Sequence, residues 1–137
     1  ELLVTRKELE RDSERSEFLR VVNSLFIGGA IPIINENDAI THEEIAFGDN
    51  DTLAAHVALR LRNSNYFQGS VTVVILSDVD GVYRDINDAS SVIRRIEHVD
   101  EYQKVAKESK DGLGTGGMVT KFRAVRLARS QGVDVYI

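Results

Sequence analysis

The sequence has no cysteine, a single proline and only three histidines among its 137 residues. Without cysteine it can form neither a disulfide bond nor a thiolate metal site, so a reducing compartment is compatible with its composition. His42, His56 and His98 lack the spacing of metal ligands or of a catalytic triad, which favours ordinary packing or surface positions. No apolar run is long enough to span a membrane and no signal peptide is visible, so we expect no membrane association.

Acidic residues outnumber basic ones. The chain has 17 basic and 22 acidic residues, which gives a net charge of −5. Because binding to nucleic acid requires a basic face, we expect no nucleic-acid partner. The length suffices for one domain with a hydrophobic core. The chain starts and ends in what look like strands, so we expect it to be part of a larger fold.

Hydrophobic patterning predicts alternating strands and helices. Strands are predicted at 2–4, 31–34, 71–76, 92–96 and 133–137, and helices at 13–27, 50–61, 99–109 and 118–131. A capping box at Thr5 and Glu8 predicts a further helical turn, and residues 39–48 suggest a small hairpin or excursion. This order predicts an α/β fold with an open, mainly parallel sheet. The continuous apolar run at 71–76 predicts a strand buried on both faces.

The segment from Gly112 to Lys121 is the most informative. It contains four glycines and leads into an amphipathic helical pattern. Glycine lets backbone N–H groups approach a ligand, and a helix N-terminus adds unpaired donors, so the segment predicts an anion site, most often for phosphate. We place Lys121 in the first helical turn, where it is best explained if it reaches the same anion. The pattern matches neither a Walker A loop nor the full Rossmann fingerprint, and a flexible helix-capping connector is the alternative.

Polar clusters follow two of the predicted strands. Asn35 to Asp38 follows the strand at 31–34, and Ser77 with Asp78 follows the strand at 71–76. In open parallel sheets ligands bind at the carboxyl ends of strands, which makes both clusters candidate binding groups. Asn35 can donate to a carboxylate and Asp38 can pair with an ammonium group. Asp78 can contact a nucleotide or hold Mg²⁺ indirectly. Polar turns are the alternative for both clusters.

A third cluster, Asp49-Asn50-Asp51, precedes the predicted helix at 50–61. Asp49 or Asn50 at the N-cap explains one of the three residues. Three polar residues in a row exceed what capping requires, and Asp51 is well placed to orient a lysine.

Together, four segments resemble the glutamate 5-kinases, a group within the amino-acid kinase family. They are Ile31–Asp38, Phe47–Asp51, Ile75–Tyr83 and Gly114–Lys121, and the resemblance spans essentially the whole chain in the expected order. It implies a three-layer α-β-α sandwich with an open, mainly parallel sheet, of which residues 1–137 form the nucleotide-binding half. It also implies ATP-dependent phosphorylation of the side-chain carboxylate of L-glutamate, the first step of proline biosynthesis.

The resemblance also implies roles for individual residues. Lys121 and Asp51 would be catalytic, and Asn35, Asp38 and Asn50 would bind glutamate. The ATP-binding set would be Ser77, Asp78, Thr115, Gly116, Gly117, Met118, Val119, Thr120 and Lys121. Mg²⁺ would arrive with ATP and have no direct protein ligand.

The sequence departs from the family pattern in three respects. The first half of the kinase domain, which carries a second lysine, is absent, as is the RNA-modification-like domain often found at the C-terminus. The stretch from Arg84 to Ser91 lacks the family's usual proline. We therefore expect the isolated chain to be inactive. The resemblance implies a cytoplasmic homo-oligomer, either dimer or tetramer. The alternatives are the kinase portion of bifunctional pyrroline-5-carboxylate synthase, an acetylglutamate, carbamate or aspartate kinase, and a non-catalytic nucleotide-binding module.

Overall fold

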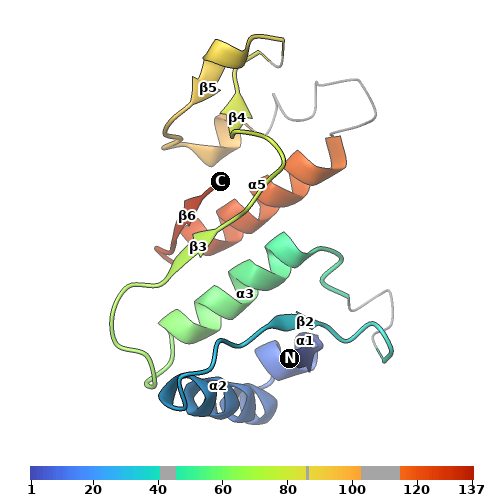
Figure 1. Cartoon of the computed structure of the whole chain (residues 1–137), viewed down its shortest axis with the longest axis vertical. Coiled ribbons are helices and arrows are strands. Elements are labelled where there is room, and N and C mark those ends of the chain that lie inside the picture. The colour runs from blue at the N-terminus through green and yellow to red at the C-terminus, as the bar shows by residue number, and fades with distance from the viewer. Residues whose placement is uncertain (41–45, 86, 103–114) are drawn as a thin grey trace.

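The computed structural model describes residues 1–40, 46–85, 87–102 and 115–137. Their helices with both bounds in these ranges are α1 (Arg6–Glu10), α2 (Asp12–Ile27), α3 (Asn50–Arg62) and α5 (Thr115–Arg129), with a 3₁₀ turn η2 at Ala89–Ser91. Their strands are β1 (Leu2–Val4), β2 (Ile34–Glu36), β3 (Thr72–Val74), β4 (Val82–Tyr83), β5 (Val92–Ile93) and β6 (Asp134–Tyr136). In Figure 1, α3 lies between β2 with α1 and α2 on one side and β3, β6 and α5 on the other.

The strands form three separate pairs within the described residues. β1 pairs with β2 and β3 pairs with β6, both in parallel, as the predicted parallel sheet requires. β4 and β5 form a small antiparallel pair. No ladder among these strands joins the two parallel pairs into one sheet. The structure is therefore a mixed helix and strand fold with parallel segments.

The strand predicted at 31–34 lies further along the chain. Leu2 pairs with Ile34 and Val4 pairs with Glu36, so the strand covers Ile34–Glu36. Ile31 and Ile33 are 87% and 67% exposed, and the prediction of a buried strand there is wrong. The apolar run indicated a strand, but pairing with β1 sets the register, and it brings the first polar residues of the cluster into β2.

The prediction that the strand at 71–76 is buried on both faces is also wrong for this chain. Val73 and Ile75 are buried, whereas Val74 and Leu76 are 62% and 91% exposed. Alternate residues of a strand point to opposite faces, so one face packs on the core and the other is uncovered. The apolar side chains on the uncovered face explain why the run looks buried from sequence.

Helix α3 belongs to two hydrophobic cores. Ala55, Ala58 and Leu59 pack in a cluster with residues of β3, α5 and β6, which we call the α5 core. Leu53, with Val57 and Leu61 partly buried behind it, packs in a second cluster with β1, α1 and α2, which we call the α2 core. Residues three and four apart share a helix face, so α3 has apolar residues on two faces.

The helix starts follow their predicted capping signals. The backbone N–H of Thr5 donates to Glu8 Oε2 at 2.6 Å, and the Thr5 side chain accepts from the backbone of the same turn, which completes the predicted capping box. Asp49 is the N-cap of α3. It follows Gly48, whose φ of +82° lies in the left-handed region that glycine adopts without strain. The order Gly-Asp therefore fixes where α3 begins.

Several other predictions can be compared with the structure. The predicted helices at 13–27 and 50–61 and the last strand are present. The strand predicted at 92–96 is only two residues long, and its partner β4 was missed because Val82-Tyr83 is too short to be recognised. Residues 99–102 are helical, while the rest of the predicted helix at 99–109 and much of the 39–48 excursion lie outside the described residues. No helix in the described parts is long and apolar enough to cross a membrane.

Candidate functional site

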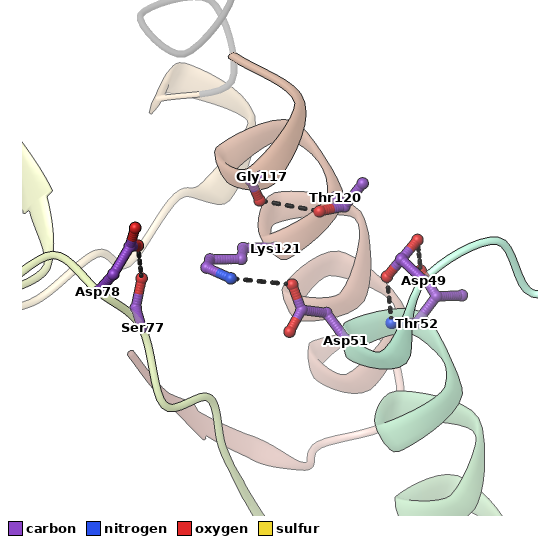
Figure 2. A network of polar contacts seen from close by, with 8 residues as sticks. All are labelled: Asp49, Asp51, Thr52, Ser77, Asp78, Gly117, Thr120 and Lys121. Atoms are coloured by element: carbon purple, nitrogen blue, oxygen red, sulfur yellow. Dashed lines mark hydrogen bonds and ion pairs between the residues drawn. The ribbon is translucent and has the colours of Figure 1, made fainter. Parts of the chain in front are cut away.

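Lys121 and Asp51 form the centre of the candidate site. Lys121 Nζ on α5 donates to Asp51 Oδ2 on α3 at 3.1 Å, across 70 positions of sequence. The two side chains are only 15% and 20% exposed. Figure 2 shows the lysine extending from α5 toward the first turn of α3. Asp51, predicted to orient a lysine, does contact one.

Small side chains let the two helices approach closely enough for this contact. Ala55 and Ala58 of α3 and Ala124 and Ala128 of α5 are all buried in the α5 core. A helix face lined by alanine allows a neighbouring backbone to come near. The closely packed helices carry Asp51 and Lys121 toward each other at one end of the contact.

Lys121 lies deeper in its helix than the sequence suggested. Since α5 begins at Thr115, Lys121 is six residues further on, in the second turn rather than the first, at about 9 Å along the axis. The prediction of a first-turn lysine is wrong because the helix starts within the glycine-rich segment. Gly116 and Gly117 are therefore helical and belong to the start of α5.

The other side chains of this helix start have varied surroundings. Thr120 Oγ1 donates to the carbonyl of Gly117 at 2.8 Å, so it is bonded within its own helix. Met118 packs beside Phe122 and Val82 in a third apolar cluster. Val119 is partly buried. Gly112 and Gly114, also part of the predicted anion segment, lie outside the described residues.

Within the Asp49-Asn50-Asp51 cluster, Asp49 is the residue that caps α3, one of the two predicted candidates. Asp49 Oδ1 accepts from the N–H of Thr52 at 2.7 Å, and Asp49 Oδ2 accepts from the Thr52 hydroxyl at 2.9 Å. Asp49 is thus occupied with capping α3. Asp51 meets the lysine, and Asn50 is exposed at the helix start, where its side chain is available to a ligand.

The first polar cluster is divided between a strand and a turn. Asn35 and Glu36 lie in β2, where successive side chains point to opposite faces, and Asp38 is exposed in the turn after it. The N–H of Phe47 donates to Glu36 Oε1 at 2.9 Å, so β2 is linked to the segment that leads into α3. No separate role was predicted for Glu36. Its position between Asn35 and Asn37 was the only signal.

Ser77 and Asp78 follow β3 and are placed more loosely. Ser77 Oγ donates to Asp78 Oδ1 at 3.5 Å, a long contact between neighbours in sequence, and Asp78 is exposed. In the view of Figure 2 they lie on the other side of Lys121 from Asp51. The groups here that suit a phosphate are the Lys121 ammonium and the backbone N–H groups at the start of α5.

The site offers little for tight binding of a free metal ion. In the parts of the chain that the structure describes, no three His, Cys, Asp or Glu side chains come together as metal ligands. Mg²⁺ bound to the phosphates of a substrate usually keeps several waters, so an exposed Asp78 can hold it indirectly, through one of them. His56 packs against Phe47 with ring centroids 5.1 Å apart, and burial lowers its pKa, as expected of a packing histidine.

The chain matches a known protein family over almost its whole length. Residues 2–137 match the model of the amino acid kinase family, and the chain belongs to that family. Among curated proteins, the whole chain is 37% identical to a glutamate 5-kinase of Symbiobacterium thermophilum, covering 51% of that protein. It is 37% identical to a glutamate 5-kinase of Clostridium acetobutylicum, covering 50%, and 39% identical to one of Sphingopyxis alaskensis, covering 36%. The chain thus spans between about a third and a half of the length of these relatives.

Proposed function

We propose that these residues form part of a glutamate 5-kinase, which transfers the γ-phosphoryl group of ATP to the side-chain carboxylate of L-glutamate. The contact between Lys121 and Asp51 is the observation that carries this proposal. It joins the motif that starts α3 to the motif that starts α5. It also holds the Lys121 ammonium at a site that contains carboxylates and a helix start. The curated relatives are glutamate 5-kinases, and we infer the substrates from their activity.

The reaction requires alignment and compensation of charge more than covalent chemistry. An oxygen of the glutamate side chain attacks the γ-phosphorus as the bond to the bridging oxygen of ADP breaks, and the products are glutamyl 5-phosphate and ADP. Lys121 offsets negative charge on the transferred group. Asp51 holds the Lys121 ammonium in place through the 3.1 Å contact, which fixes its direction before substrate arrives.

The remaining residues are assigned to the two substrates. On the acceptor side, the Asn35 and Asn50 amides donate to glutamate and Asp38 accepts from its ammonium group. On the nucleotide side, backbone N–H groups at the start of α5 hold phosphate oxygens, with Thr115, Gly116, Gly117, Met118, Val119 and Thr120 forming that segment. Ser77 and Asp78 contact the nucleotide. Mg²⁺ bound to ATP supplies further positive charge and takes no direct protein ligand here.

We further propose that the strands belong to one open, mainly parallel sheet in a three-layer α-β-α sandwich. The support is the uncovered face of β3, where Val74 and Leu76 are exposed, and the exposed Tyr136 of the neighbouring β6. Apolar side chains on a sheet are stable when another layer covers them. Residues 1–137 are then the nucleotide-binding half of a kinase domain that acts in the cytoplasm as a homo-oligomer, a dimer or tetramer.

The function is tested with the protein produced from its complete reading frame. Hydroxylamine traps an acyl phosphate as a hydroxamate, so product should form only with both ATP and L-glutamate present. Aspartate, N-acetylglutamate and carbamate serve as competing acceptors. If the protein prefers one of these acceptors, that compound and not glutamate is its substrate. If it binds ATP but transfers phosphate to no acceptor, it is a nucleotide-binding module and not a kinase.

A further inference from the structure

Glu36 is a partly buried carboxylate to which the proposed reaction gives no task. It lies at the end of β2, and its Oε1 accepts the backbone N–H of Phe47 at 2.9 Å. The two residues are 11 positions apart, so this contact closes the chain between β2 and the approach to α3. A hydrogen bond to an ionised carboxylate is stronger than one between neutral groups.

The residue that Glu36 holds is itself fixed by packing. Phe47 is 3% exposed and belongs to the α2 core. Its ring lies against His56 and has the guanidinium of Arg6 5.5 Å from its centroid. With the side chain held by packing and the N–H held by Glu36, the backbone of Phe47 is constrained on both sides.

The fixed backbone of Phe47 leads directly into the residues proposed to bind the acceptor. Gly48 follows with its left-handed φ, then Asp49 caps α3, and Asn50 and Asp51 are the first residues of that helix. Asn35 precedes Glu36 in β2, and Asp38 follows it by two residues. Glu36 is therefore a link between the two segments that supply every residue assigned to glutamate.

We propose that Glu36 is a positioning residue for the acceptor subsite. Its hydrogen bond to Phe47 sets the distance between the Asn35–Asp38 segment and the Asn50–Asp51 start of α3. The identity of the acceptor rests on the proposed function, whereas the link itself rests on the structure. The nucleotide side, at β3 and the start of α5, is outside this link.

Two substitutions separate the hydrogen bond from the charge. Glu36→Gln keeps a side-chain oxygen that can accept from Phe47, and Glu36→Ala removes the acceptor. In the protein from its complete reading frame, we expect Glu36→Ala to raise the glutamate KM by about tenfold and to leave the ATP KM within about twofold. Glu36→Gln should recover most of the loss. Glu17→Ala is the matched control, because Glu17 is exposed and pairs only locally with Arg20 on α2.

Amide hydrogen exchange at Phe47 tests the link without reference to activity. The Phe47 N–H should exchange slowly in the original protein and in Glu36→Gln, and at least about tenfold faster in Glu36→Ala. Unchanged exchange in Glu36→Ala would overturn the inference. So would a rise of both KM values together with a lower melting temperature, since that marks a general loss of structure. If no glutamate is phosphorylated by the original protein, the proposed function fails, and fast exchange in Glu36→Ala still supports the link.

Discussion

The two sides of the candidate site differ in how firmly the protein holds them. On the acceptor side, Glu36 binds the Phe47 amide and Asp49 binds both the amide and the hydroxyl of Thr52. On the nucleotide side, Ser77 and Asp78 have one long contact with each other, and Asp78 is exposed. The proposed acceptor side is thus held by more hydrogen bonds within the protein than Ser77 and Asp78 are at the end of β3. Lys121 lies between them and is tied to the first side through Asp51.

The largest effect should come from removing the cation that both sides share. Lys121→Ala should lower kcat by about 10²–10³-fold, because the mutant loses charge stabilisation in the transition state, and it should change the glutamate KM far less. Steady-state kinetics with both substrates varied give the two values. Arg123→Ala, which removes an exposed cation two residues further along α5, should leave kcat nearly unchanged. A normal kcat for Lys121→Ala would remove the lysine from the reaction.

Substitution of an exposed residue on the proposed acceptor side should weaken glutamate binding without changing stability. Asp38 is exposed, so Asp38→Ala should raise the glutamate KM by about tenfold and leave the melting temperature unchanged, because only a contact to substrate is lost. Kinetics and thermal unfolding measured on the same preparation test both parts. An unchanged KM would place Asp38 outside the acceptor subsite.

Substitution of an aspartate that is hydrogen-bonded within the protein should lower stability instead. Asp49→Ala should lower the free energy of unfolding by about 1 kcal/mol, because α3 loses its N-cap, as urea titration would measure. Asp49→Asn keeps an acceptor at the cap and should recover most of that loss. If Asp49→Ala proves as stable as the original protein, the acceptor side is held by contacts other than its cap.

The smallest effect concerns pH. Burial lowers the pKa of His56, with Arg6 and Arg60 acting in the same direction and Glu10 opposing them. The folded protein therefore binds this proton less readily than the unfolded chain, whose histidine has its ordinary pKa of 6.5. The contribution of neutral His56 to stability is complete above that pH and is lost as the pH falls below it. Urea titrations across this range should show a weaker acid dependence for His56→Gln, and an identical dependence would contradict the assignment.

Local signals in the sequence predicted where α1 and α3 start. Capping residues at Thr5 and Asp49 act within one helical turn, so the sequence contains the whole cause of those helix starts. The pairing of Asp51 with a lysine was also expected, because three polar residues exceeded what one cap needs. The two caps depend on neighbours in sequence. The pairing of Asp51 was predictable because the local cap did not account for its charge.

Features that depend on distant partners were predicted less well. Pairing with β1 places the second strand at Ile34–Glu36, further along the chain than predicted. Helix α5, which carries Lys121, begins within the glycine-rich segment rather than after it. The link from Glu36 to Phe47 has no sequence signature, because a glutamate in a polar run looks the same whether it meets solvent or a backbone amide. Tertiary pairing decides these cases, and a single sequence does not contain it.

The alanines between α3 and α5 have a consequence for how this protein can change over generations. Ala55, Ala58, Ala124 and Ala128 set the separation of the two helices, and that separation sets the reach from Lys121 to Asp51. A bulkier residue at one of these positions would push the helices apart and weaken the ion pair unless a facing side chain shrank in the same lineage. Size at these four positions should therefore vary in a correlated way among relatives, although all four are buried in the α5 core.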